Sequence, residues 1–277
     1  MMIIFSTCWY ILKAKFNKEI YQVWIDNFLA NVNNFYLVIY TNNESYYMLE
    51  KYITNPRIKI IIFQLSEFYK YKDYWIKNHA VNNLLNINTS WQLNMLWSEK
   101  ISFVKKSFDE KYFINSESFD NNSNIEGIWY GWCDIGYFRG RPNDLPINII
   151  KEWPNKDKIK ELNQAKIYYA KVNNNINEMN NYIKNILSKN QEGLPTNPID
   201  PNQVSIAGGF FLIYNTNIDW WHNVYDAKLR LYFENNRLVK DDQIIVLDSI
   251  VTNMAKFILV EERNQYDNWF MFQRYLL

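Results

Sequence analysis

An acid, a glycine and an arginine follow closely on the apolar segment GIWYGWCD (127–134). Asp134 ends that segment, Gly136 stands two residues on, and Arg139 stands five residues on. A strand-end carboxylate can bind a divalent cation that bridges phosphate oxygens, and a guanidinium can donate to phosphate. Glycine lets the backbone turn tightly and approach a ligand. The alternative is a local turn in which Asp134 accepts hydrogen bonds from nearby N–H groups.

Two other places put unusual residues into apolar patterns. Lys100 falls on the apolar stripe of a predicted helix, where an ammonium either reaches solvent or meets an anion such as Asp134 or a phosphate. Gly208 and Gly209 interrupt a predicted strand, which indicates either a ligand close to the backbone or a packing constraint. Both interpretations stay open for each of the three residues.

Histidine, cysteine and the common nucleotide motifs give negative information. His79 and His222 have no Cys, Asp or Glu at zinc-ligand spacing, and Cys8 and Cys133 lie in apolar runs, as buried reduced thiols do. The sequence contains no GxGxxG, P-loop, GxSxG or HExxH motif. These absences exclude dinucleotide oxidoreductases, P-loop kinases, serine hydrolases and zincins.

The elements that must position these residues alternate between strands and helices. Apolar, β-branched runs predict strands, and apolar residues at helical spacing predict helices between them. This alternation predicts one α/β domain with a mainly parallel sheet, whose ligands bind at the carboxyl ends of the strands. The predicted strands are 3–8, 35–41, 58–65, 127–134, 204–214 and 256–260, and the predicted helices are 20–31, 42–54, 91–106, 156–170, 175–188, 216–233 and 241–254.

Composition limits the partners of the chain. Its 277 residues are 48% hydrophobic, enough for a sizeable core, and a formal net charge of +1 supplies no general attraction to nucleic acid or anionic membranes. No apolar run reaches the roughly 18 residues of a transmembrane helix. Together with the two unpaired cysteines, these observations predict a soluble protein of a reducing compartment, the cytoplasm, with no nucleic-acid partner.

Three motifs in this order resemble the HtrL/YibB-like family, which is classed with the glycosyltransferases. They are WCDIGYFRG (132–140), AGGFF (207–211) and DDQ (241–243), and the resemblance extends from IIFSTC to DDQII. It implies a GT-A-like α/β fold, a single domain over residues 1–277 with a mainly parallel central sheet flanked by helices. About residues 1–140 would then bind the nucleotide-sugar donor and about 141–277 the acceptor.

The same resemblance implies a metal ion. Asp134 corresponds to the first carboxylate of the D-x-D motif of more distant GT-A families, including the glycogenin-like ones, so Mn²⁺ or Mg²⁺ is expected at Asp134. Gly136 stands where the second carboxylate would be, and no late histidine matches the third ligand. Phosphate oxygens and waters could complete the coordination shell. The alternative is metal-free stabilisation of the leaving group by Arg139 and Lys100.

The resemblance also assigns the rest of the site. Asp241 and Asp242 suit a helix start, as cap and first-turn acid, and the functional interpretation adds that Asp242 faces the sugar while Gln243 bonds a hydroxyl. Both interpretations can hold together. The implied sets are catalytic Asp134, Asp242 and Gln243; donor-binding Ser6, Thr7, Trp9, Lys100, Asp134, Gly136 and Arg139; and acceptor- or sugar-binding Gly208, Gly209 and Asp241.

The expected activity is transfer of a hexose or N-acetylhexosamine from a UDP- or GDP-sugar to a glycan or glycoprotein acceptor in glycan biosynthesis. Because Gly136 replaces a ligand carboxylate, one alternative is a catalytically inactive nucleotide-sugar- or carbohydrate-binding protein of the same fold. A nucleotidyltransferase is another alternative. Its usual glycine- and lysine-rich segment after the first strand is missing.

Overall fold

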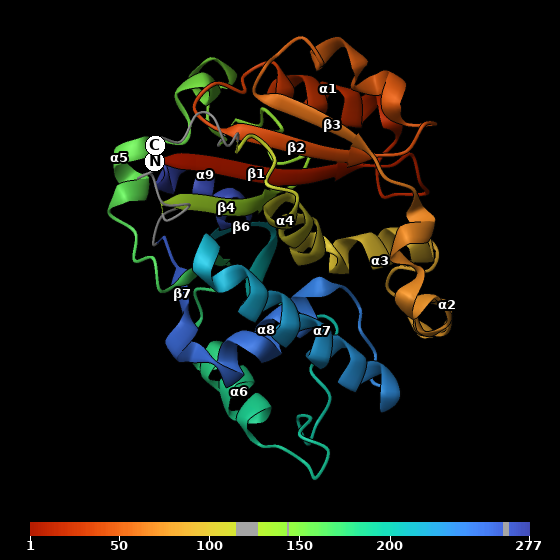
Figure 1. Ribbon diagram of the computed structural model, residues 1–277. Helices are drawn as coiled ribbons and strands as arrows, with labels where there is room; N and C mark the ends of the chain where they lie inside the picture. The colour runs from red at the N-terminus through yellow and green to blue at the C-terminus, as the bar shows by residue number, and fades with distance from the viewer. Residues whose placement is uncertain (115–126, 143, 263–265) are drawn as a thin grey trace.

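The computed structural model describes residues 1–114, 127–142, 144–262 and 266–277, and one seven-stranded sheet runs through it (Figure 1). The strand order is β3-β2-β1-β4-β6-β5-β7. Strands from both halves of the chain therefore share one sheet. The strands are β1 (Met2–Trp9), β2 (Tyr36–Thr41), β3 (Ile58–Ile62), β4 (Ile128–Cys133), β5 (Ile167–Lys171), β6 (Ile206–Tyr214) and β7 (Phe257–Val260).

The first four strands are parallel, as their continuous apolar sequences predict. β1 pairs with β2 in the register Ile4↔Tyr36 and with β4 in the register Ile4↔Tyr130. Such strands are apolar on both faces because helices cover both sides of a parallel sheet. The prediction of an α/β domain with a mainly parallel sheet is confirmed.

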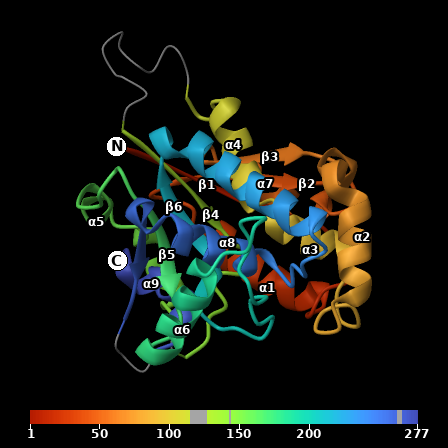
Figure 2. The same ribbon diagram turned by 90° about the horizontal axis from the view of Figure 1, so that it is seen from below.

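Helices lie on both faces of the sheet and enclose two apolar clusters. Figure 2 shows α7 and α8 in front of the strands, and they share one cluster with Ile4 of β1. Phe28 of α1 belongs to the other cluster, with Phe5 of β1. The helices are α1 (Lys18–Leu29), α2 (Lys72–Val81), α3 (Trp91–Ser98), α4 (Lys100–Asp109), α5 (Lys156–Lys160), α6 (Ile176–Leu187), α7 (Ile218–Glu234), α8 (Asp242–Thr252) and α9 (Phe272–Tyr275).

β6 runs antiparallel to both of its neighbours. It pairs with β4 in the register Cys133↔Phe210, and with β5 in the register Ile167↔Ile213. The start of β6 therefore lies beside the end of β4, and Asp134 N donates to Gly209 O at 2.9 Å. This pairing brings the two sequence motifs together at the carboxyl end of β4.

Several predicted elements are wrong. Residues 156–170, predicted as one helix, form the short α5 and then the buried strand β5. The predicted helix 91–106 is two helices, α3 and α4, that meet at Glu99. Residues 42–54 form two short 3-10 turns instead of a helix, and α2 (Lys72–Val81) is not predicted.

Two further expectations concern membranes and thiols. Across the described part of the chain, no helix has the length and apolar character needed to cross a bilayer. Cys8 and Cys133 are both free, in agreement with the prediction of reduced thiols.

Candidate active site

Asp134 is the first residue after β4, at the carboxyl end of this central strand. Its backbone is held on both sides, since its N–H bonds Gly209 and its carbonyl accepts from Tyr137 N at 2.9 Å. Its side chain is 40% exposed and accepts a hydrogen bond from the indole N–H of Trp132. The strand end thus presents a rigidly placed carboxylate to an open space.

Lys100, at the start of α4, lies between this carboxylate and a second one. Its Nζ donates to Asp242 Oδ2 at 2.9 Å and to Gly208 O at 2.8 Å, and it lies 3.7 Å from Asp134 Oδ1. The lysine side chain is only 9% exposed and that of Asp242 only 7%. Of the two alternatives left open for Lys100, the structure shows contact with anions, which are Asp134 and Asp242.

Electrostatics at this cluster follow from burial and charge. Burial alone lowers the pKa of Lys100, but Asp134 and Asp242 raise it well above its ordinary value. Burial raises the pKa of Asp242 to about 6, although Lys100 opposes the rise. Contact with the two acids therefore keeps Lys100 in its ammonium form despite its burial.

The two glycines of β6 leave room for these carboxylates. A Cβ on Gly208 would lie 2.7 Å from Asp242 Oδ2, and a Cβ on Gly209 would lie 3.2 Å from Asp134 Oδ2. Contacts below about 3 Å force atoms to move, so a side chain at residue 208 would push Asp242 from its place. Packing against Asp242 therefore requires glycine at residue 208, and both glycines also line the cavity beside the acids.

The start of α8 combines a cap with a cavity wall. Asp241 is the N-cap, its side chain accepts from Gln243 N at 3.2 Å, and its other oxygen lies 3.0 Å from Lys240 Nζ. Asp241, Asp242 and Gln243 also line the cavity. The capping interpretation therefore holds for Asp241 and is compatible with contact to a ligand.

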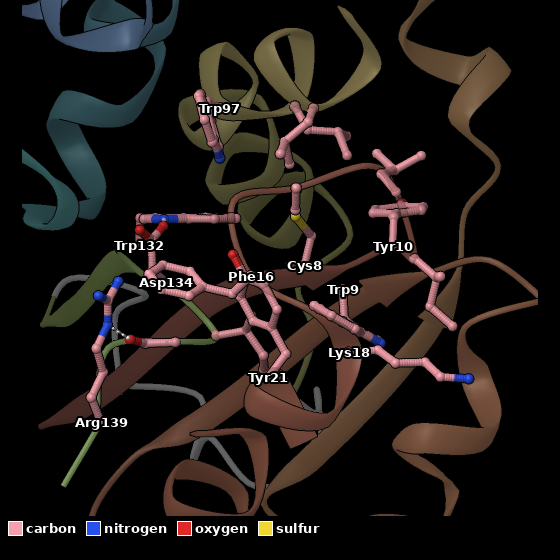
Figure 3. A pocket seen from close by; sticks show the side chains of 17 residues that line it. Cys8, Trp9, Tyr10, Phe16, Lys18, Tyr21, Trp97, Trp132, Asp134 and Arg139 are labelled. Atoms are coloured by element: carbon pink, nitrogen blue, oxygen red, sulfur yellow. Dashed lines mark hydrogen bonds between the residues drawn. The ribbon is translucent and has the colours of Figure 1, made fainter. Parts of the chain in front are cut away.

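Two adjoining cavities meet at Asp134. The first, here called the charged pocket, has a volume of about 350 Å³ and contains Asp134, Asp241, Asp242, Lys100, Lys15, Arg139 and Arg141. The second, the aromatic pocket, is shown in Figure 3. Asp134, Gly136 and Arg139 line both cavities. The aromatic pocket is lined mainly by Trp9, Tyr10, Phe16, Tyr21, Leu93, Leu96, Trp97 and Trp132.

Arg139 stands at the boundary between the cavities. Its guanidinium carbon lies 4.4 Å from the ring centre of Trp24 and 4.9 Å from that of Phe270, and its Nε donates to Gly136 O at 3.1 Å. Burial lowers the pKa of Arg139, and Asp134 opposes this effect. The described part of the chain offers it no ion pair, so its charge is available to an anionic ligand.

Gly136 is required by packing rather than by a ligand. A Cβ there would lie 2.8 Å from Cε3 of Trp24, the ring that also supports Arg139. An aromatic ring therefore takes the space beside Gly136, and contact between its backbone and a donor stays a prediction. The glycine still forms part of both cavity walls.

The residues expected at the end of the first strand divide into two groups. Ser6 and Thr7 are fully buried, and Ser6 Oγ lies 2.8 Å from Ser107 Oγ under α4, so the structure places neither at a cavity. Trp9 lines the aromatic pocket, packs against Tyr21 at a ring separation of 4.9 Å, and donates its indole N–H to Met48 Sδ. Of these three residues, only Trp9 lines one of the two cavities.

Several cavity residues escaped sequence analysis. Trp97 and Tyr21 line both cavities, Lys15 lies over the Trp97 ring at 5.6 Å, and Arg141 and Trp269 line the charged pocket. Trp97 carried the one usable signal, because it lies three residues before Lys100 in the helix predicted at 91–106. The others come from separate segments, Tyr21 from α1 and Trp269 from a 3-10 turn, and only the tertiary fold brings them together.

The donor set does not fit a metal ion held by the protein. Among the described residues, no group of three His, Cys, Asp or Glu side chains is placed to hold one. Asp134 faces the Lys100 ammonium and the Trp132 indole, and Asp242 bonds the same ammonium. His79 is elsewhere, its Nε2 lying 3.2 Å from Thr89 O, and His222 lines a different cavity. The expected Mn²⁺ or Mg²⁺ at Asp134 thus lacks partner ligands from these residues.

Among known proteins, the likeness is to solved structures and not to sequences. No protein-family model matches the sequence, and no curated protein matches it. One similar solved structure is the galactosyltransferase LgtC in complex with donor and acceptor sugar analogues. It shares 9% identity and a TM-score of 0.44 over 90% of this chain and 70% of that chain. Similarity at this level bears on neither substrate nor mechanism, and the resemblance to the HtrL/YibB-like family rests on the sequence motifs alone.

Proposed function

We propose that the protein is a glycosyltransferase that moves a hexose or N-acetylhexosamine from a UDP- or GDP-sugar to a glycan or glycoprotein acceptor. The observation that carries the proposal is the junction of an aromatic pocket with a charged pocket at Asp134. A nucleotide sugar has the same division, a flat base at one end and a diphosphate and sugar at the other. The junction lies at the carboxyl end of β4, where ligands of α/β sheets bind.

The base belongs in the aromatic pocket. Trp97 and Tyr21 offer ring faces, and stacking of a base on an aromatic side chain contributes about 1–3 kcal/mol. The diphosphate then lies beside Arg139, whose guanidinium has no carboxylate partner in the described chain, and near Lys15 at the rim. A planar guanidinium suits phosphate oxygens because it donates two parallel hydrogen bonds.

The sugar belongs in the charged pocket. There the bond from the anomeric carbon to the diphosphate oxygen breaks, the acceptor hydroxyl oxygen bonds that carbon, and the hydroxyl proton passes to the departing diphosphate or to solvent. Positive charge develops on the sugar ring during this exchange, and Asp134 is the exposed carboxylate that can stabilise it. Asp242 and Gln243 line the same space, where the amide can bond a sugar hydroxyl.

The test is release of nucleoside diphosphate from a panel of UDP-, GDP- and dTDP-sugars with mixed glycan acceptors. We expect Asp134→Asn to lower turnover roughly 100-fold or more, because it removes the exposed negative charge. Asp157→Asn, on the exposed helix α5, is the matched control and should keep full activity. Unchanged turnover in Asp134→Asn would refute the assignment.

A second function, binding of a nucleotide sugar without turnover, is favoured by one observation. Gly136 stands where a second carboxylate is expected, and its space is filled by Trp24. Calorimetry and the diphosphate-release assay together separate the two functions. Tight binding of a nucleotide sugar by calorimetry, with no diphosphate release for any donor and acceptor, would assign the chain to this second class.

A further inference from the structure

Lys100 occupies the position between the two acids that a divalent cation would need. Its ammonium has three N–H donors. Two are directed to Asp242 Oδ2 and Gly208 O, at 2.9 and 2.8 Å, and Asp134 Oδ1 is the next oxygen at 3.7 Å. The three oxygens come from β4, β6 and α8, so one side chain of α4 joins the elements that form the charged pocket.

We infer that Lys100 is a built-in cation that replaces a divalent metal ion between Asp134 and Asp242. As an account of catalysis this inference rests on the proposed function, although the cation site itself does not. A metal ion needs several oxygen ligands with free lone pairs, and here the ammonium already binds Asp242 and a backbone oxygen. An entering dication would also lie within a few ångströms of a buried positive charge.

The charge for a diphosphate then comes from Arg139 instead of a metal ion. Arg141, the other arginine of the charged pocket, is bound to Asp144 and Asp267, both at 2.8 Å. Arg139 makes no such pair within the described residues, and the rings of Trp24 and Phe270 hold its guanidinium. Lys100 balances the acids, and Arg139 remains free for the phosphates.

The first experiment measures Mn²⁺ binding and UDP binding to the unmodified protein by calorimetry. We expect no saturable Mn²⁺ binding below about 1 mM, and a UDP affinity that changes less than about threefold between Mn²⁺ and EDTA. Saturable Mn²⁺ binding by the protein alone, or a UDP affinity that falls about tenfold or more in EDTA, would overturn the inference.

The second experiment vacates the position of the ammonium. Lys100→Met leaves Asp242 buried without its partner, so we expect the melting temperature to fall by roughly 10 °C. Millimolar Mn²⁺ should recover several degrees of that loss, because the vacated oxygens can then bind a dication. A Lys100→Met protein that Mn²⁺ leaves unchanged would contradict the inference.

The double variant Lys100→Met with Asp242→Asn is the matched control. It removes both charges, so it should melt above the single variant and show no response to Mn²⁺. Equal Mn²⁺ responses in the single and double variants would show that the ion binds elsewhere and would sink the inference. These readouts involve no turnover, so a failure of the proposed function would leave them standing.

Discussion

The aromatic pocket and the charged pocket share a wall, but they are built in different ways. Every residue that lines the aromatic pocket comes from positions 8–139. The charged pocket draws on positions 15–141 and again on 208–270. The first cavity is a product of one half of the chain, and the second exists only where both halves meet.

The two pockets also handle polarity differently. The rings of the aromatic pocket pack against one another, as Trp9 and Tyr21 do, and most residues of its lining are uncharged. In the charged pocket most charges have partners inside the protein, as Lys100 has Asp242 and Arg141 has Asp267. The difference teaches that the first pocket should determine affinity for an apolar group. The second should determine what happens to charge during a reaction.

Gly208→Ala should have the largest effect on the difference between the two pockets, because it disturbs only the charged pocket. Its Cβ would lie 2.7 Å from Asp242 Oδ2, so the carboxylate must move and its bond to Lys100 must lengthen. We expect a loss of about 1–3 kcal/mol in the free energy of unfolding and roughly a 100-fold loss of turnover. Urea unfolding and diphosphate release measure the two effects.

Gly209→Ala is the control for that change. Its Cβ would meet Asp134 Oδ2 at 3.2 Å, and that side chain is 40% exposed and can shift into the cavity. It should lose less stability than Gly208→Ala. If the two alanines were equally stable, the buried Lys100–Asp242 pair would not be the constraint on residue 208.

Trp97→Ala tests whether the aromatic pocket determines affinity for a nucleotide. Removing the ring takes away a stacking surface worth about 1–3 kcal/mol, so affinity for UDP or GDP should fall about tenfold while the maximal rate stays within about threefold. Trp91→Ala, on the same helix but outside both pockets, should leave nucleotide affinity unchanged. A Trp97 variant with normal affinity and a low rate would reverse the roles given to the two pockets.

Glu99 supplies the smallest effect, because it is an acid beside Lys100 in sequence that lines a separate cavity. Burial raises the pKa of Glu99 to about 7 from an ordinary 4.5, although a hydrogen bond from Ser102 opposes the rise. Between about pH 4.5 and 7, the carboxyl group of Glu99 is therefore protonated in the folded state and ionised in the unfolded state. This contribution to stability is complete below about pH 4.5 and is lost as the pH rises through about 7.

Glu99→Gln should remove that pH dependence. Near pH 5 the variant and the parent should have similar unfolding free energies, and near pH 8 the variant should be more stable by about 1–2 kcal/mol. Urea unfolding at both pH values measures this difference. A parent protein that gains stability between those values relative to the variant would show that Glu99 is ionised and paired in the folded state.

Sequence reasoning reached the parts of the molecule that local pattern controls. The apolar run before Asp134 predicts a strand end, and the structure has one there. The stripe that contains Lys100 limits its ammonium to two alternatives, solvent or an anionic partner, and the structure shows the second. Each signal lies within about ten consecutive residues, where periodicity carries information.

The rest depended on contacts between distant segments. The strand IYYAK (167–171) is short, and the helix-forming residues before it hid it within a predicted helix. Gly136 was interpreted as a ligand contact because its neighbour Trp24 belongs to a helix more than 100 residues earlier. The antiparallel direction of β6 has no local signal, because its apolar sequence suits either direction equally.

The late position of β6 in the chain sets the order in which the two pockets are made during synthesis. A chain leaving the ribosome completes β1 to β4, and with them the lining of the aromatic pocket, long before β6 is made. Until β6 is made, β4 is an edge strand, and the N–H of Asp134 lacks its acceptor, the backbone oxygen of Gly209. The lining of the aromatic pocket should therefore be complete before the charged pocket can form.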